Sequence, residues 1–250
     1  MWPNSVNATI DPSMTGTSFL DPASTWDNRF ESQDYIFGLE PNDYLRAQIA
    51  HLTPGGKVLC VADGEGRNGV WLARQGMCVD AFDISEVGVA KARKLAVDAG
   101  VTVDFSVADS DHWPWPVEAY DTVAAIFVQF ADPPTRERLF AHMVRSLQRG
   151  GLLVLQGYTP KQLDYKTGGP PILSHLYTPD MLRSAFSALE IIELQEYEKD
   201  LTGRHATSRS IGPDRAARPK VLMGARGRRQ SARPGLMQTY RMDAAHVVSG

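Results

Sequence analysis

The sequence predicts an α/β fold in which helices cover both faces of a mainly parallel β-sheet. Apolar segments of strand length alternate with segments of helical period along most of the chain, which is typical of repeated strand-helix-strand units. A glycine-bearing turn at residues 62–69 joins the first such strand to its helix. With 250 residues, 43% of them apolar, the chain is long enough for one well-buried domain and too short for two large ones.

The elements follow from periodicity and from the residues that start and stop them. A first helix over Tyr44–Leu52 is started by Pro41-Asn42-Asp43 and stopped by Pro54-Gly55-Gly56. Strands are expected where apolar runs lie between turn residues: Lys57–Val61, Cys78–Phe82, Thr102–Val107, Thr122–Val128, Leu152–Gln156 and Glu190–Glu196. Helices are expected between them, where caps and a 3.6-residue period coincide: Arg67–Gln75, Ser85–Ala99, Pro134–Leu147 and Asp180–Ser187.

Composition divides the chain into three parts. Residues 1–24 are polar and proline-bearing without periodicity, which predicts a mobile arm, and residues 25–202 form the domain. Residues 203–250 predict a basic, mostly disordered tail. Residues 1–200 hold 16 Lys+Arg against 27 Asp+Glu, and residues 201–250 hold 10 against 2. The acidic body disfavours nucleic acid as the main substrate, whereas a tail that grips nucleic acid or an acidic partner stays open.

The sequence predicts a protein of the cytoplasm. Its only cysteines, Cys60 and Cys78, fall in predicted buried strands, which fits a reducing compartment. Residues 1–20 lack the basic start and apolar centre of a signal peptide, and no apolar run approaches the length of a membrane span.

The glycine turn predicts a nucleotide-cofactor site. Gly64, Gly66 and Gly69 satisfy G-x-G-x-x-G, a spacing that dinucleotides and S-adenosylmethionine (SAM) both use. Asp63 and Glu65 would repel a pyrophosphate, but they suit the sulfonium and ammonium of SAM. The turn therefore favours SAM, with an NAD(P)-linked oxidoreductase, or a turn that binds nothing, as the alternatives.

Residues that follow the next strands complete the predicted site, because open α/β sheets bind ligands at the carboxyl ends of their strands. Asp83 is expected to accept hydrogen bonds from ribose hydroxyls, or else to cap the helix that follows. Ile84 is expected against the adenine face, and Asp109 at the adenine amino group unless it only closes an acidic turn. Trp113 and Trp115 either cover the adenine or pack at the surface.

The chain resembles the class I SAM-dependent methyltransferases over residues 26–202. Within that family it is similar to the small-molecule branch, which includes tellurite-resistance (TehB-like) and thiopurine-methyltransferase-like enzymes. The resemblance is carried by short strings along the domain: Trp26-Asp27-Asn28-Arg29-Phe30, Gly38-Leu39-Glu40-Pro41-Asn42, Asp63 to Asn68, Asp83-Ile84-Ser85, Ala108-Asp109, Tyr120-Asp121, Gly150-Gly151, Gln156-Gly157-Tyr158 and Leu176-Tyr177-Thr178-Pro179.

The resemblance implies a Rossmann-like class I methyltransferase sheet of seven strands with an antiparallel last strand. It also implies SAM as donor and a lid over the cofactor formed by the segment from Trp26 to Tyr35. The glycine turn, the strand ends and the resemblance together predict these residues at the cofactor: Trp26, Arg29, Ala62, Asp63, Gly64, Gly66, Arg67, Asn68, Asp83, Ile84 and Asp109.

The chain departs from the family pattern at two places. Ala62 and Cys60 stand where the family has Gly and often an acid. The family also ends soon after an apolar strand, whereas this chain continues through a basic segment, so that either the last strand is missing or Lys220–Gly224 forms it.

Methyl transfer from a sulfonium is an in-line displacement that needs positioning more than a dedicated base. Gln129, Tyr158 and Tyr165 are the predicted orienting residues, Arg29 is a predicted anion contact, and no metal site is expected. The predicted acceptor is a small molecule, namely a thiol, a selenol or a metalloid oxyanion such as tellurite. A SAM-binding protein without turnover that acts through its basic tail remains the alternative of a different class.

Overall fold

The computed structural model describes residues 21–165, 169–200 and 217–227. Its strands run through one sheet: β1 Lys57–Val61, β2 Cys78–Asp83, β3 Asp104–Val107, β4 Tyr120–Ile126, β5 Leu147–Tyr158, β6 Leu189–Asp200 and β7 Ala217–Gly227. Its helices are α1 Pro22–Phe30, α2 Asp43–Ala47, α3 Arg67–Arg74, α4 Glu86–Asp98, α5 Pro133–Ser146, α6 Gln162–Tyr165 and α7 Pro179–Ala185, with 3-10 turns at Ile49–His51 and Leu173–His175.

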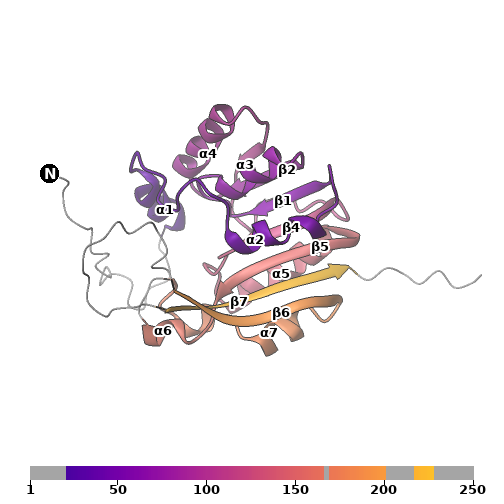
Figure 1. Cartoon of the computed structure of the whole chain (residues 1–250). Helices are drawn as coiled ribbons and strands as arrows, with labels where there is room; N and C mark the ends of the chain where they lie inside the picture. Colours follow the sequence, from indigo (N-terminus) through magenta and orange to yellow (C-terminus); the bar gives the residue numbers. More distant parts are fainter. Residues whose placement is uncertain (1–20, 166–168, 201–216, 228–250) are drawn as a thin grey trace, which may run out of the picture.

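The seven strands lie in the order β3-β2-β1-β4-β5-β7-β6 (Figure 1). The first five are parallel to one another, and β7 runs antiparallel to both of its neighbours. The chain fills one side of β1 with β2 and β3 and then crosses to the other side with β4. This change of direction places the ligand crevice of such a sheet at the carboxyl ends of β1 and β4. The predicted Rossmann-like α/β fold is confirmed.

Two apolar layers hold the helices on the sheet. α2, α3 and α4 cover one face, where Leu45, Leu72 and Ala92 are fully buried. α5 and α7 cover the other, where Met143 and Leu182 are fully buried. Burial of the leucine and methionine side chains contributes about 1.5–3 kcal/mol each. The two layers fix the strand ends that carry the site.

α4 begins at the expected cap, and α5 begins at a cap that was not predicted. Ser85 Oγ accepts the backbone N–H of Gly88 at 2.9 Å at the start of α4, and Asp132 caps α5 with Pro133 at its first position. The same signal, Asp21 followed by Pro22, starts α1. The segment 1–24, predicted as an arm, therefore contributes residues 22–24 to a helix.

The sheet also takes a strand from the segment predicted as a tail. β7 pairs with β5 through Met223 and Leu155 and with β6 through Met223 and Leu194. Met223 and Ala225 are fully buried. The antiparallel last strand is thus present, with wider bounds than Lys220–Gly224. The remaining residues after 200 lie outside the described part of the chain.

The cysteines differ from the expectation that both are buried. Cys60 in β1 is buried, and burial raises the pKa of its thiol, whereas Cys78 at the start of β2 is exposed. Neither forms a disulfide. Among the described residues, no helix combines the length and the apolar character needed to cross a membrane.

Because β7 lies inside the sheet, we expect a chain that ends at residue 200 to lose cooperative unfolding, since β5 and β6 would lack their shared partner. A chain that ends at residue 230 keeps β7 and should melt within about 4 °C of the full chain, which corresponds to about 1 kcal/mol or less. Thermal unfolding followed by circular dichroism measures both. Equal cooperativity of the two truncated chains would contradict this placement of β7.

Candidate cofactor site

The glycine loop between β1 and α3 turns through residues with left-handed backbone. φ is 49° at Ala62, 57° at Gly64 and 86° at Gly66. A Cβ on Gly66 would lie 2.6 Å from the Cβ of Ala92, so only glycine lets α3 and α4 approach this closely. Ala62 adopts the same conformation with a side chain, at a cost of about 1–2 kcal/mol. A glycine at position 62 would avoid this strain.

Asp83, at the end of β2, holds this loop in place. Its Oδ2 accepts the backbone N–H of Gly64 at 2.8 Å, and its Oδ1 accepts that of Ser85 at 3.0 Å. Burial raises the pKa of this carboxyl, and its hydrogen bonds oppose the rise. The alternative that Asp83 caps α4 is wrong, because Ser85 provides the cap. Backbone N–H groups of Gly64, Ser85 and Ile84 leave the carboxylate a lone pair with which it can accept a ribose hydroxyl.

The two acids of the loop are held in different ways. Asp63 is partly buried and accepts the N–H of Gly69 at 2.9 Å, and burial raises its pKa to about 7. The side chain of Glu65 is 3% exposed, and its Oε1 lies 2.5 Å from Lys91 Nζ. Its Oε2 is buried and has no hydrogen-bond donor among the described residues. The loop thus contains an excess of buried acceptors over donors.

The first residues of α3 bind the preceding segment of the chain. Arg67 donates to the carbonyl of Phe37 at 2.8 Å, and Asn68 Oδ1 accepts the N–H of Asn42 at 2.9 Å. Asn42 in turn donates to the buried Gln156 at 2.7 Å. The predicted cofactor ligands Arg67 and Asn68 therefore border the loop, but the contacts above fasten the segment between α1 and α2.

α1 lies beside α4 (Figure 1), and its Phe30 contacts Gly64 of the glycine loop. Trp26 stacks on Phe30 with ring centroids 5.4 Å apart, and the exposed Arg29 lies over the Trp26 ring. Phe30 is 1% exposed and fits against two glycines, because a Cβ on Gly64 or Gly88 would come within 3.2 or 3.0 Å of its ring. Sequence reasoning named Trp26 and Arg29 and missed Phe30 as the residue in contact. The i, i+4 spacing from Trp26 after an Asp-Pro helix start was the available signal.

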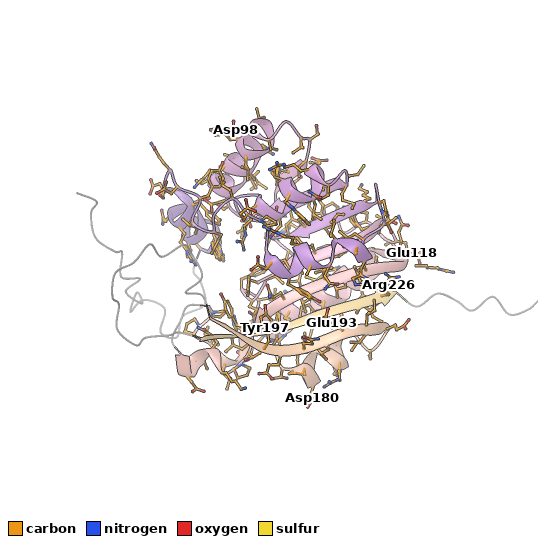
Figure 2. The ribbon with its side chains drawn as sticks, viewed as in Figure 1. Asp98, Glu118, Asp180, Glu193, Tyr197 and Arg226 are labelled. Atoms are coloured by element: carbon orange, nitrogen blue, oxygen red, sulfur yellow. The ribbon has the colours of Figure 1, made fainter. Side chains whose placement is uncertain are left out.

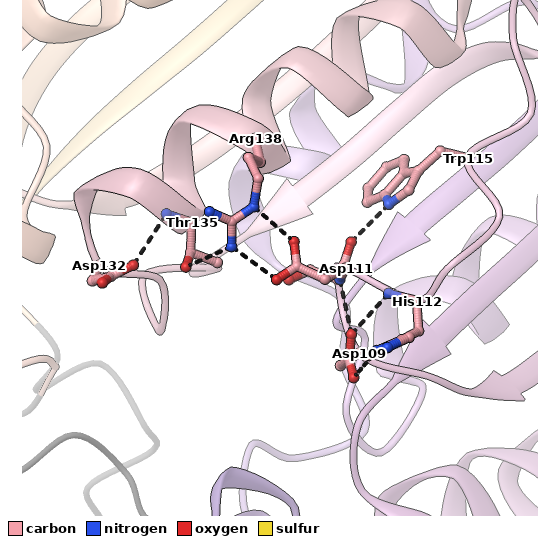
Figure 3. A network of polar contacts seen from close by, with 8 residues as sticks. Asp109, Asp111, His112, Trp115, Asp132, Thr135 and Arg138 are labelled. Atoms are coloured by element: carbon pink, nitrogen blue, oxygen red, sulfur yellow. Dashed lines mark hydrogen bonds and ion pairs between the residues drawn. The ribbon is translucent and has the colours of Figure 1, made fainter.

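The predicted adenine acid, Asp109, closes its own turn. Its Oδ1 accepts the backbone N–H groups of Asp111 and His112, and its Oδ2 lies 2.7 Å from His112 Nδ1 (Figure 3). Burial alone would raise the pKa of Asp109, but the bonds from His112 and Asp111 lower it. Arg138 of α5 binds Asp111 with two hydrogen bonds of 2.9 and 3.0 Å and fixes the turn. The geometry matches the acidic-turn alternative.

The aromatic side chains near this turn pack on β2. Trp113 stacks on Phe82 with centroids 4.8 Å apart, and Trp115 is 2% exposed with its indole N–H bonded to the carbonyl of Ser110. Trp115 is therefore core and not surface packing. Ile84 is partly exposed directly after β2, where the adenine contact was predicted.

Gln129 holds the end of β5. Its Nε2 donates to the carbonyls of Tyr158 and His175, and its Oε1 accepts the N–H of Tyr158 at 2.5 Å. The side chain is 3% exposed. The predicted role of orienting an acceptor is therefore corrected, because both amide hydrogens already bind the protein and Gln129 positions Tyr158 instead.

Tyr158 and an unpredicted neighbour form an aromatic pair at the ends of β5 and β4. Phe127 stacks on Tyr158 with centroids 4.7 Å apart and has a left-handed φ of 61°, which is rare for a bulky residue. Strained residues of this kind concentrate at functional sites. Nothing in the sequence around Phe127 indicates this backbone. Tyr165 ends α6, and its side chain lies outside the described part of the structure.

Part-buried polar contacts join β5 and α2 to β6. Gln156 donates to the hydroxyl of Tyr197 at 2.6 Å, and Tyr44 donates to Glu193 at 3.3 Å. Figure 2 labels Tyr197 and Glu193, which both lie on β6. The contacts tie α2 and the centre of the sheet to its antiparallel side. Within the described residues, no cluster of His, Cys, Asp and Glu side chains is arranged to hold a metal ion.

Comparisons with known proteins agree with this geometry. Residues 58–151 match the family model of a methyltransferase domain. A tRNA (uracil(54)-C(5))-methyltransferase of Pyrococcus abyssi is 26% identical over 187 residues, which cover 65% of this chain and 44% of that protein. This chain spans less than half the length of the first curated relatives that it matches.

Two solved structures share the fold. One, from the conversion of a disulfide bond into a thioacetal group during echinomycin biosynthesis, has a TM-score of 0.63 and 17% identity, covering 84% of this chain and 94% of its own. TehB from Haemophilus influenzae has a TM-score of 0.59 and 17% identity, covering 82% of this chain and 67% of its own. The family match and the fold support a class I SAM-dependent methyltransferase, and they imply SAM as the cofactor.

The residues present fit that cofactor. The unpaired Oε2 of Glu65 supplies negative charge at the loop, as a sulfonium and an ammonium require. Burial raises the pKa of Asp63 to about 7, and a cation bound beside it would favour its ionised form. Asp83 keeps a lone pair for a ribose hydroxyl. The cation in contact with Glu65, Lys91, also binds backbone carbonyls of the segment after α1. The same surplus of acid would oppose the pyrophosphate of a dinucleotide.

We expect Asp83→Ala to weaken binding of S-adenosylhomocysteine about 100-fold or more, because two hydrogen bonds to a charged group are worth about 1.5–3 kcal/mol each. Calorimetric titration measures the dissociation constant. Asp98→Ala is the matched control, since Asp98 is an exposed carboxylate at the end of α4. Unchanged affinity in a folded Asp83→Ala variant would show that the ribose is held elsewhere.

The raised pKa of Asp63 predicts a pH dependence of stability. In the folded chain Asp63 keeps its proton up to about pH 7. In the unfolded chain the pKa of an aspartate is about 3.9. Folding therefore binds a proton between these values, so the free energy of unfolding falls as pH rises from about 4 to 7 and then levels off.

Asp63→Asn removes this proton uptake, so its stability relative to the wild type should increase from pH 4 to 7 and stay constant above. Urea unfolding at several pH values measures the difference. Parallel profiles for the two proteins would contradict the raised pKa.

Proposed function

We propose that this chain transfers the methyl group of SAM to a small-molecule acceptor, namely a thiol, a selenol or a metalloid oxyanion such as tellurite. The observation that carries the proposal is the docking of α1 on the glycine loop, with Phe30 seated against Gly64 and Gly88. A small molecule can enter a covered site completely. A base that is part of a folded nucleic acid would reach such a site less readily.

When bound, SAM supplies an electrophilic methyl group on a sulfonium, which a nucleophile attacks in line. The residues of this chain would contribute binding, orientation and exclusion of water. Asp83 would hold the ribose, and Asp63 and Glu65 would offset the positive charges. Phe127 and Tyr158, at the ends of the strands next to the loop, would form a wall of the acceptor space.

The choice of acceptor has limited support from relatives. The thioacetal-related structure is named for sulfur chemistry of that protein, but this structure and TehB, both 17% identical, share only the fold with this chain. The Pyrococcus relative acts on tRNA, but residues 1–200 carry 27 Asp+Glu against 16 Lys+Arg, and phosphate contacts need the opposite balance. The unpaired cysteines support a reducing compartment such as the cytoplasm.

The proposal is tested by incubating the purified chain with methyl-labelled SAM and a panel of thiols, selenols, selenite and tellurite. We expect labelled product from at least one of them and a loss of about 100-fold in kcat/KM in Asp83→Ala. In parallel, bulk tRNA is tested as a methyl acceptor, and NADH is tested for binding.

Each other outcome selects a different function. Methyl transfer to tRNA alone would replace the acceptor class. Binding of S-adenosylhomocysteine with no turnover on any acceptor would favour a binding protein that acts through the basic segment after residue 200. Binding of NADH in its place would favour an oxidoreductase.

A further inference from the structure

Lys91, on α4, joins two segments that lie far apart in the sequence. Its ammonium is 2.5 Å from Glu65 Oε1 in the glycine loop. The same ammonium donates to the backbone carbonyls that end α1 and follow it: Phe30 at 3.2 Å, Ser32 at 2.8 Å and Asp34 at 2.8 Å. It also lies 4.9 Å from the ring centre of Tyr35, whose hydroxyl donates to the carbonyl of Lys91. A single side chain thus contacts both the loop and the lid.

The charges around Lys91 are buried. Its side chain is 15% exposed and that of Glu65 is 3% exposed. The carbonyls at the end of α1 lie at the negative end of that helix, where a cation is favourable. Loss of the ammonium would leave the Glu65 carboxylate without a counter-charge in a buried site, which proteins tolerate poorly. The loop and the residues after α1 therefore depend on the same cation.

α1 has a second attachment that does not involve Lys91. Asp27 Oδ1 accepts the hydroxyl of Ser85 at 2.5 Å and the backbone N–H of Val87 at 3.1 Å, and Phe30 is buried independently. The body of α1 should therefore stay on α4 when Lys91 is replaced. The segment from Glu31 to Tyr35 and the glycine loop should loosen.

From this geometry we propose that Lys91 is a positioning residue that couples the glycine loop to the lid, the segment from Trp26 to Tyr35. Loosening of either segment would then loosen the other. The proposal rests on the proposed function for its effect on the cofactor, since a coupled loop and lid would retain a bound ligand longer. The coupling itself is a property of the free protein and is testable without a cofactor.

The experiment compares Lys91→Met with Lys94→Met. Lys94 lies on the same helix, is exposed and pairs with Asp98 at the surface, so it is the matched control. Hydrogen exchange of the cofactor-free proteins is measured at backbone amides 31–36 and 64–66. We expect exchange at least tenfold faster in both segments for Lys91→Met, and unchanged exchange for Lys94→Met.

Glu65→Gln tests the coupling against a purely local role. It changes the loop alone, so faster exchange at amides 31–36 would show transmission through Lys91, and the double variant should be no faster than Lys91→Met. Lys91→Arg, which keeps the charge, should restore part of the protection. Unchanged exchange at 31–36 in Glu65→Gln, or loosening of one segment alone in Lys91→Met, would overturn the proposal.

Binding of S-adenosylhomocysteine provides the second readout. We expect dissociation at least tenfold faster in Lys91→Met and within twofold of the wild type in Lys94→Met. A wild type that binds no S-adenosylhomocysteine would count against the proposed function, while the exchange data would still decide the coupling. Coupled exchange with unchanged dissociation would overturn the role of Lys91 in retaining the cofactor.

Discussion

Asp83 accepts one backbone N–H from the glycine loop and another from the start of α4, so a single buried carboxylate fixes both relative to β2. The rest of the site depends on this arrangement. The loop brings Gly66 against Ala92 of α4, and α4 then supplies Ser85 and Lys91 as the attachments of α1. A buried carboxylate is costly unless it is fully hydrogen-bonded. The position of Asp83 therefore constrains four segments at once.

The sequence identified the parts of the fold that depend on local pattern. β1 has the predicted bounds, and the helices from α3 to α7 start within one residue of their predicted starts, except for α6, which was not predicted. Apolar runs between turn residues locate the central strands well, because these strands are buried on both faces. β7 was weakly indicated because two of its buried residues, Gly224 and Ala225, are small and give little apolar signal.

The candidate site was predictable in position and less so in contacts. Strand ends placed Asp83, Ile84 and Tyr158 correctly at one edge of the sheet, because parallel strands of an open sheet end together. The partner of Glu65 lies on α4, and the acceptors of Lys91 are backbone carbonyls, which carry no residue-type signal. The amide of Gln129 likewise binds backbone groups. Contacts of this kind follow from the assembled fold and not from local spacing.

The place of β7 has a consequence for how the chain is made. A ribosome releases β1 to β5 first, and these strands can pair with one another as they emerge. β6 then leaves the exit tunnel before its partner in the described sheet, β7, which follows residues 201–216. During that interval the edge of β5 is open to pairing with other chains. A nascent chain that stalls between Asp200 and Ala217 would therefore be a natural client for a chaperone.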